Sequence, residues 1–206
     1  MFVRLTGCNL RCTWCDSEYT FKGGQRMTIE EVEHEVRRVS PDAGLVEITG
    51  GEPLLQEREA VTLMDRLLRA GYTVLLETSG ERPLDNVPPA VVKIVDVKCP
   101  DSGEAGTFRL ENLRWLTPRD EVKFVVASRR DYEFARSFIG EHGLSSRVVS
   151  VILSPAFRKD AAGSRDVSHC LLDPQLLAEW MLADGLNARL GLQIHKFIWE
   201  PSLKGV

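Results

Sequence analysis

Short apolar runs alternate along the chain with longer segments in which apolar residues recur at helical spacing. The short runs are bounded by Gly, Pro, Ser or Thr, as buried strands are, and the longer segments carry capping residues such as Thr28 and stop signals such as Gly71. The predicted strands are 2–5, 45–49, 73–77, 91–97, 122–126, 148–153 and 190–198. The predicted helices are 28–39, 60–68, 131–142 and 174–182.

Strands and helices in this alternation are typical of parallel βαβ units. The pattern predicts an α/β fold, a partial (β/α) barrel with a mostly parallel open sheet. Residues 99–116 and 160–168 lack a regular pattern and are predicted to be loops. We expect one domain spanning 1–206, because a chain of 206 residues buries enough surface for a core of its own.

The composition is that of an ordinary globular protein, with 43% hydrophobic and 27% charged residues. Lys and Arg number 26 against 30 Asp and Glu, so the net charge is -4, and no basic run dominates any segment. Nucleic-acid binding through a phosphate-neutralising surface is therefore disfavoured. No apolar stretch approaches the roughly 18 residues that span a bilayer, and residues 1–7 alternate like a strand, so we expect a cytoplasmic protein without a membrane segment.

Polar residues and glycines gather directly after the predicted strands. In parallel sheets of this kind, ligands bind at the carboxyl ends of the strands. The positions concerned are Cys8, Thr49, Gly50, Gly51, Glu52, Thr78, Ser79, Lys98 and Ser154. Turn chemistry alone explains any one of them, since Gly, Ser and Thr are common at strand ends. Their recurrence after successive strands predicts a binding site along one edge of the sheet.

Three of the five cysteines form the sequence Cys8-x3-Cys12-x2-Cys15. In a reducing compartment such clustering indicates a metal site rather than disulfides. Three thiolates leave one coordination position open, which suits an iron-sulfur cluster with an exchangeable iron. A structural zinc site needs a fourth protein ligand, for which His34 or Cys99 is the candidate. The cysteines outside the motif are Cys99 and Cys170.

The cysteine motif, with an aromatic residue directly before Cys15, and the later stretch Thr49-Gly50-Gly51-Glu52-Pro53 resemble the radical S-adenosylmethionine superfamily. The resemblance implies a 4Fe-4S cluster held by Cys8, Cys12 and Cys15 in the loop 7–17. It also implies S-adenosylmethionine, whose amino and carboxylate groups chelate the open iron. Reductive cleavage of this cofactor then yields methionine and a 5′-deoxyadenosyl radical.

The same resemblance implies roles for the residues around the cofactor. The methionine ammonium needs acceptors, which the carbonyls of Gly50 and Gly51 and the carboxylate of Glu52 provide. Lys98 can pair with the cofactor's carboxylate and Trp14 can pack against its adenine, the alternatives being a surface lysine and a core aromatic. The other positions expected at the cofactor are Cys15, Asp16, Thr78 and Ser79.

Further stretches over nearly the whole chain are similar to the 7-carboxy-7-deazaguanine synthase family. They include Arg4-Leu5-Thr6-Gly7, Cys15-Asp16-Ser17, Glu77-Thr78-Ser79-Gly80 and residues 97–104, 120–125 and 193–199. The resemblance implies a lyase that converts 6-carboxy-5,6,7,8-tetrahydropterin to 7-carboxy-7-deazaguanine, contracting the ring and releasing ammonia on the route to queuosine and other 7-deazapurines. The alternatives are an activase that places a glycyl radical on a partner enzyme and a zinc-binding module without catalysis.

Carried over to this chain, the resemblance places Arg4 at the pterin carboxylate, Thr49 and His195 beside the pterin, and the terminal carboxylate of Val206 at its guanidine-like edge. A guanidinium suits a carboxylate, and a carboxylate suits paired donors. Ser17, where the family often has Thr, keeps a hydroxyl oxygen for the expected Mg2+. The alternatives are an exposed strand arginine, a core histidine and a frayed terminus.

The resemblance also implies partners. They are the pterin substrate, an electron donor such as flavodoxin or ferredoxin, and a second copy of the chain in a homodimer. Members of the family usually carry an earlier strand with a Gln-Gly-Glu stretch that contacts the pterin, whereas Met1 falls where that segment has already passed. We therefore expect either a start assigned too late or a shortened chain, in which the pterin contacts are incomplete.

Overall fold

Seven parallel strands form one sheet in the computed structural model, which describes residues 1–39, 41–42, 44–159, 166–200 and 203. The strands lie in chain order, so β1 and β7 are the two edges and the sheet is open. They are β1 (Phe2–Leu5), β2 (Leu45–Gly50), β3 (Thr73–Thr78), β4 (Val92–Asp96), β5 (Glu121–Val126), β6 (Ser150–Pro155) and β7 (Arg189–Leu190). The predicted α/β fold with an open parallel sheet is therefore confirmed.

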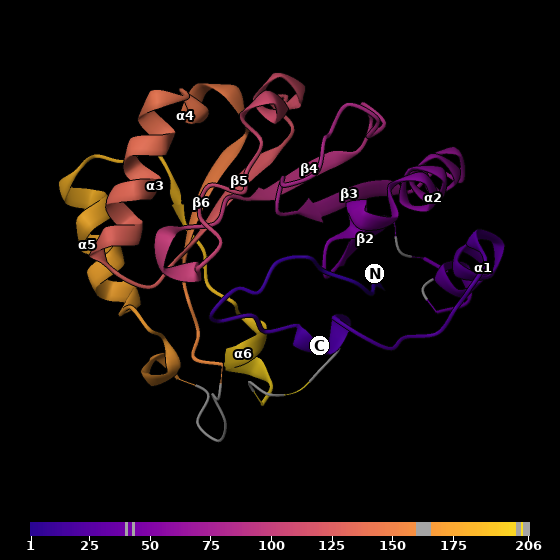
Figure 1. Ribbon diagram of the computed structural model, residues 1–206, viewed down its shortest axis with the longest axis horizontal. Coiled ribbons are helices and arrows are strands. Elements are labelled where there is room, and N and C mark those ends of the chain that lie inside the picture. Colours follow the sequence, from indigo (N-terminus) through magenta and orange to yellow (C-terminus); the bar gives the residue numbers. More distant parts are fainter. Residues whose placement is uncertain (40, 43, 160–165, 201–202, 204–206) are drawn as a thin grey trace.

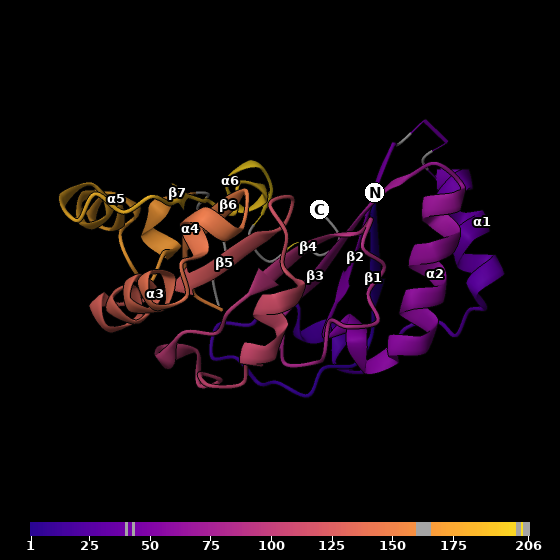
Figure 2. The same ribbon diagram turned by 90° about the horizontal axis from the view of Figure 1, so that it is seen from above.

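The main helices cover the outside of the arc that the strands form (Figure 1). They are α1 (Ile29–Val39), α2 (Glu57–Arg69), α3 (Arg129–Glu141), α4 (Leu144–Arg147) and α5 (Pro174–Ala183), whereas the short α6 (His195–Ile198) lies on the inner side of the arc (Figure 1). α2 packs on β2 and β3 at one end of the arc, and α3 to α5 pack on β5 and β6 at the other. The two groups are well separated when the molecule is seen from above (Figure 2). Of the described helices, none is both long and apolar enough to cross a membrane.

Local chemistry explains where the helices begin. The Glu31 N–H donates to the Thr28 hydroxyl at 3.2 Å and the Thr28 N–H donates to the Glu31 carboxylate at 2.6 Å, so a reciprocal capping box opens α1. α5 begins with Pro174 after Asp173, whose carboxylate accepts from the Gln175 N–H at 2.8 Å. The four predicted helices and the first six predicted strands are all present, with their ends shifted by a few residues.

The predicted strand 190–198 is wrong. Only Arg189 and Leu190 pair with β6, and the chain then turns inward to form α6. The apolar alternation that suggested a strand leaves Leu192 41% and Ile194 62% exposed, whereas Lys196 is buried. No sheet face covers these apolar side chains among the described residues, so the alternation had no packing partner to enforce it.

The two predicted loops differ in outcome. Residues 99–116 contain two short 3-10 helices, Pro100–Ser102 and Leu110–Trp115, so the prediction of loop alone was incomplete there. Of the predicted loop 160–168, residues 160–165 lie outside the described residues. A further 3-10 helix, Val167–His169, follows them.

Alternate positions of the strands differ in chemistry. The outward side chains, which include Val46, Ile48, Leu76, Val122 and Phe124, are apolar and buried beneath the helices. The inward side chains include the charged residues Arg4, Glu47, Glu77, Asp96 and Lys123 beside apolar ones such as Ile94 and Val125. A parallel sheet covered on both faces is normally apolar on both. The charged inner face therefore indicates a cavity rather than a second core.

Candidate active site

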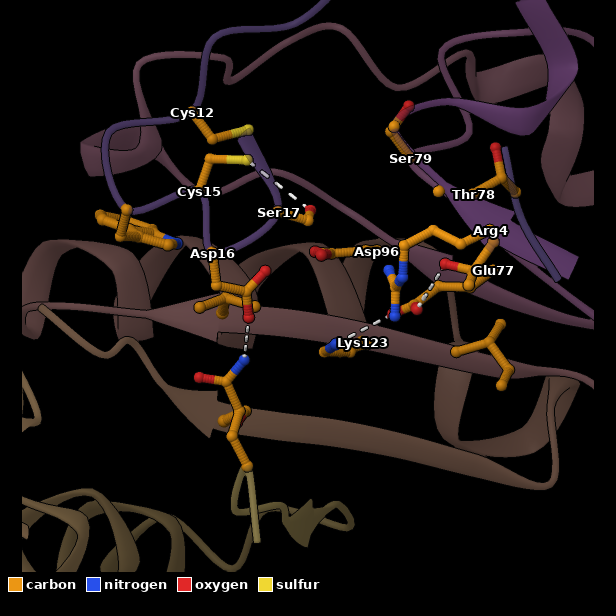
Figure 3. A pocket seen from close by; sticks show the side chains of 18 of the residues that line it. Arg4, Cys12, Cys15, Asp16, Ser17, Glu77, Thr78, Ser79, Asp96 and Lys123 are labelled. Atoms are coloured by element: carbon orange, nitrogen blue, oxygen red, sulfur yellow. Dashed lines mark hydrogen bonds and ion pairs between the residues drawn. The ribbon is translucent and has the colours of Figure 1, made fainter. Parts of the chain in front are cut away.

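A cavity of about 600 Å³ lies on the inner side of the sheet. Side chains from β1 to β6, the cysteine loop and residues 191–196 line it. The predicted site residues that it brings together are Arg4, Cys8, Cys12, Trp14, Cys15, Asp16, Ser17, Thr49, Gly50, Gly51, Glu52, Thr78, Ser79, Lys98 and His195. Val206 lies outside the described residues. The strand-end residues thus share one cavity, with Cys12, Cys15 and Ser17 on one side and Arg4, Glu77 and Thr78 on the other (Figure 3).

Hydrogen bonds to backbone carbonyls inside and outside the cysteine loop hold it in place. The Gly7 N–H donates to the Thr20 carbonyl at 2.7 Å, the Thr13 N–H donates to the Ser102 carbonyl at 2.9 Å, and the Arg11 guanidinium donates to the Cys8 carbonyl at 2.8 Å. The three thiols line the cavity and remain half-buried, whereas the other two cysteines are buried. Within the described residues, no three His, Cys, Asp or Glu side chains are arranged around a single metal ion. Several irons need thiols spread around a space, which is what the loop offers.

A lysine and a carboxylate meet beside these thiols at the end of β4. The Lys98 ammonium lies 2.8 Å from Asp96 Oδ2, whereas Asp96 Oδ1 is buried and has no hydrogen-bond partner in the described part of the chain. Burial raises the pKa of the Cys12 thiol to about 11, and the Lys98 charge opposes that rise. Burial lowers the pKa of Lys98, but Asp96 and Cys12 outweigh it and the pKa is raised. Lys98 therefore stays charged and favours the thiolate form that iron binds.

Gly50 at the end of β2 and Gly51 directly after it are required by the close approach of β1 and the cysteine loop. Gly50 has φ +146°, and a Cβ there would lie 2.0 Å from the Leu5 carbonyl oxygen. A Cβ on Gly51 would lie 2.2 Å from the Gly7 carbonyl oxygen. The Gly51 N–H donates to the Leu5 carbonyl at 3.1 Å, so the turn after β2 is in direct backbone contact with the end of β1. A side chain at Gly50 would push β1 away, and one at Gly51 would push the start of the cysteine loop away.

Glu52 is 1% exposed and accepts four hydrogen bonds. The donors are the Thr78 hydroxyl at 2.7 Å, the Ser79 N–H and hydroxyl at 2.9 and 2.7 Å, and the Leu54 N–H at 3.1 Å. A carboxylate offers about four lone-pair positions, so the protein satisfies Glu52 internally. Thr78 and Ser79, both predicted at the cofactor, therefore hold the Glu52 carboxylate, and both line the cavity.

Opposite the cysteines, an ion pair crosses the inner face. The Thr49 hydroxyl donates to Glu77 Oε2 at 3.2 Å, and the Lys123 ammonium lies 3.0 Å from Glu77 Oε1. Lys123 holds the pKa of Glu77 well below its usual range. Arg4 is exposed on β1, with its guanidinium 5.8 Å from the Phe2 ring centroid. Glu77 and Lys123 were not predicted as site residues. Each is a charged residue within a short, largely apolar strand, and that pattern could have indicated a side chain that faces a cavity.

The segment after β7 closes the open side of the sheet against the cysteine loop. The Gln193 amide donates to Asp16 Oδ2 at 2.8 Å, and the Lys196 ammonium lies 3.4 Å from the same oxygen and 5.0 Å from the Phe157 ring centroid. His195 between them is half-buried, and burial lowers its pKa, so the imidazole is neutral at pH 7. Gln193 and Lys196 were missed as site residues because their contacts join segments far apart in the chain.

Comparisons with known proteins agree on one family. The sequence profile of the Radical SAM superfamily matches residues 2–97. The chain is 68% identical over 206 residues to the 7-carboxy-7-deazaguanine synthase of Koribacter versatilis, covering all of this chain and 91% of that protein, and 43% identical over 208 residues to the synthase of Chlorobaculum tepidum, covering all of this chain and 87% of that protein. The crystal structure of QueE from Escherichia coli shares the fold, with TM-score 0.68 and 24% identity over 93% of this chain and 84% of that one. The chain therefore belongs to the 7-carboxy-7-deazaguanine synthase family of radical SAM enzymes.

Proposed function

We propose that this chain converts 6-carboxy-5,6,7,8-tetrahydropterin to 7-carboxy-7-deazaguanine, with contraction of the ring and release of ammonia. Its family consists of radical SAM lyases of 7-deazapurine biosynthesis. The observation that carries the proposal is the single cavity in which three thiols face a polar, charged substrate side. The names of the relatives also argue against the activase and zinc-module alternatives.

The residues on the thiol side fit the cofactors of this family. Cys8, Cys12 and Cys15 would hold a 4Fe-4S cluster. Lys98 and the unpartnered oxygen of Asp96 offer a cation and an acceptor side by side, which matches the carboxylate and ammonium of the methionine part of S-adenosylmethionine. When bound, these cofactors supply a carbon-centred radical that removes a hydrogen atom from the substrate.

The residues on the opposite side fit a carboxylated pterin. Arg4 lies at the inner face without a carboxylate partner among the described residues, so its guanidinium is available for the substrate carboxylate. Thr49 and Glu77 present oxygen atoms to the pterin edge, and neutral His195 can both donate and accept a hydrogen bond there. Their role is to orient the substrate, because a misplaced radical would react elsewhere.

Ser17 carries the proposed Mg2+ contact. Its hydroxyl lines the cavity 3.8 Å from the Cys15 sulfur, next to the Asp16 carboxylate. A hard cation prefers such oxygen atoms, and Mg2+ usually takes few of them from the protein. Ser17→Ala should lower turnover and weaken its dependence on Mg2+ while iron content stays intact. An unchanged response to Mg2+ in that variant would exclude Ser17 as the contact.

We further propose that residues 1–206 work as one domain, that flavodoxin or ferredoxin supplies the electron, and that two copies form a homodimer. Exposed apolar side chains on the last described segment, among them Ile194, Ile198 and Trp199, offer a surface for the second copy. Light scattering of the purified protein tests the dimer. Reduction of the cluster by each donor protein, followed by its visible absorbance, tests the electron source.

Anaerobic incubation of the reconstituted protein with the pterin, S-adenosylmethionine and a reductant tests the function. We expect 7-carboxy-7-deazaguanine and ammonia, and we expect Arg4→Gln to raise the KM for the pterin while Arg69→Gln, an exposed change on α2, leaves it unaltered. A brown colour and iron in the purified protein would support the enzyme and exclude the zinc-binding module. A glycyl radical on a partner protein without any deazaguanine would contradict the proposal.

A further inference from the structure

A second carboxyl group lies beneath the substrate side of the cavity. Glu47 is on β2, two residues before Thr49 and on the same inward face, and it lines the cavity together with Glu77 of β3. β2 and β3 are neighbouring strands, so the two carboxyl groups share one face of the cavity. Two carboxyl groups placed together in this way disfavour a charge on both, so one of them tends to keep its proton.

The surrounding charges decide which carboxyl keeps that proton. Lys123 of β5 lies 3.0 Å from Glu77 and, together with Lys98 and the Thr49 hydroxyl, favours its ionised form. Among the described residues no cation lies as close to Glu47, although Lys123 and Arg4 of β1 act on it from a distance. Burial, followed by the charge of Glu77, raises the pKa of Glu47 to about 7. Near neutral pH the proton therefore resides on Glu47.

The proposed reaction has a use for such a pair, and this inference rests on the proposed function. The departing nitrogen is bonded to one hydrogen in the substrate and leaves as ammonia, so it gains two hydrogens. The product carries two fewer carbon-bound hydrogens than the substrate, and no external oxidant or reductant is consumed. The hydrogen atom that the radical removes from carbon and later returns can supply one of the two hydrogens on nitrogen, and the other must leave carbon as a proton. The site therefore needs a proton acceptor near the ring carbon and a donor near the nitrogen.

We propose that Glu47 and Glu77 form the proton carrier for ammonia release. Ionised Glu77 takes a proton from a ring carbon, the C–H electron pair forms the new ring double bond, and the C–N bond breaks with its electron pair on nitrogen. The pair then holds two protons. It gives one of them to the nitrogen and so returns to its starting state. Glu77 is the member that faces the substrate, and Glu47 is a positioning residue that acts through it.

The variant Glu47→Gln tests the carrier in the reconstituted holoenzyme, with the exposed Glu59→Gln on α2 as the matched control. We expect Glu47→Gln to keep iron content and hydrogen transfer from the substrate into S-adenosylmethionine, but to release ammonia about 100-fold more slowly. Wild-type activity should fall as pH rises through about 7, because Glu47 loses its proton there, and the variant should lack this fall. Glu47→Asp keeps a carboxyl group and should restore part of the rate and the pH dependence.

Infrared titration of the protein without cofactors gives a readout that does not depend on activity. The absorbance of a protonated carboxyl should disappear as pH rises through about 7 in the wild type and in Glu59→Gln, and should be missing in Glu47→Gln. If Glu47→Gln fails to fold, the same titration of Glu47→Asp should show the band at a shifted pH. Wild-type ammonia release and pH profile in Glu47→Gln, or an unchanged band, would overturn the inference. A wild type that makes no deazaguanine but shows the band would instead count against the proposed function.

Discussion

The two faces of the same strands follow different physical rules. On β5, Val122, Phe124 and Val126 point outward, are at most 1% exposed and pack beneath the helices, whereas Lys123 and Val125 point inward and line the cavity. Burial of the outward side chains contributes roughly 1.5–3 kcal/mol each. Inward ion pairs contribute little net stability, because the cost of desolvating two charges offsets their attraction.

One charged side chain lies on the otherwise apolar outer face. Lys93 of β4 is buried there, but its ammonium lies 3.2 Å from Asp120 and 3.3 Å from the Val91 carbonyl, so its charge is satisfied inside the protein. On the inner face, Asp96 keeps one oxygen without a partner in the described residues, and Arg4 has no carboxylate there. A bound ligand could satisfy both groups, whereas the other buried side-chain atoms without a partner in the described residues, on Glu81, Ser150 and His169, belong to residues that do not line the cavity.

Loss of a cluster cysteine should give the largest effect and affect activity alone. Cys12→Ala should abolish iron binding and product formation, but change the free energy of unfolding of the cofactor-free protein by less than about 1 kcal/mol, because Cys12 is half-buried. The control Cys99→Ala removes a buried thiol and should lower stability by about 1 kcal/mol with full iron content. Iron analysis and urea unfolding measure both. Full iron in Cys12→Ala would refute the cluster assignment.

Valine-to-alanine substitutions on the two faces of β5 compare how much each face contributes to the free energy of unfolding. Val126→Ala on the outer face should lower the free energy of unfolding by roughly 1.5–3 kcal/mol, because the side chain is fully buried. Val125→Ala, one residue earlier, should cost less than about 1 kcal/mol because its side chain borders the cavity. Urea unfolding of the cofactor-free proteins compares them. Equal losses would show that the inner face is part of the core.

Ser79→Ala tests the junction where the two faces meet. The change removes a hydroxyl that donates to the buried Glu52 carboxylate at 2.7 Å and should cost about 1–3 kcal/mol, since one acceptor position loses its donor. Ser145→Ala, which removes an exposed hydroxyl bonded to the Asn187 carbonyl, should cost less than about 0.5 kcal/mol. Thermal or urea unfolding distinguishes the two. If Ser79→Ala left the free energy of unfolding unchanged, the remaining hydrogen-bond donors would be enough to stabilise the Glu52 carboxylate.

The last expected effect is on the pH dependence of stability. The pKa of Glu47 is raised in the folded protein, so between its unfolded value and about 7 the folded state holds a proton that the unfolded state has released. Stability therefore falls as pH rises through this window. Glu47→Gln should reduce the fall between pH 5 and pH 8, and Glu59→Gln should not. Parallel curves for all three proteins would argue against a raised pKa at Glu47.

Periodicity predicted the elements wherever a helix or a neighbouring strand covers the apolar positions. It failed at 190–198, where alternating apolar residues remain exposed and the chain instead buries Lys196 against Asp16. That outcome depends on a contact between the two ends of the chain, and local spacing carries no information about it.

The cysteine spacing and the strand-end residues predicted where the cavity lies, but its opposite wall only in part, through residues such as Arg4 and Thr49. The charges of Glu47, Glu77 and Lys123 stand among apolar residues in short strands, and the sequence alone does not say which face points inward. Likewise, Glu52 was predicted as a free acceptor, whereas the structure surrounds it with donors from β3 and its own turn. Such partners follow from strand register, which becomes visible only in three dimensions.

Transfer of a deuterium label tests the central claim that the inner face presents the substrate to the cofactor. The pterin carries deuterium on the carbon that bears the carboxylate, and the reconstituted enzyme turns it over with S-adenosylmethionine under anaerobic conditions. The account predicts 7-carboxy-7-deazaguanine together with deuterium in recovered S-adenosylmethionine, and loss of this transfer in Arg4→Gln with iron content intact. Deuterium that appears only in solvent, or label transfer that is indifferent to Arg4, would contradict it.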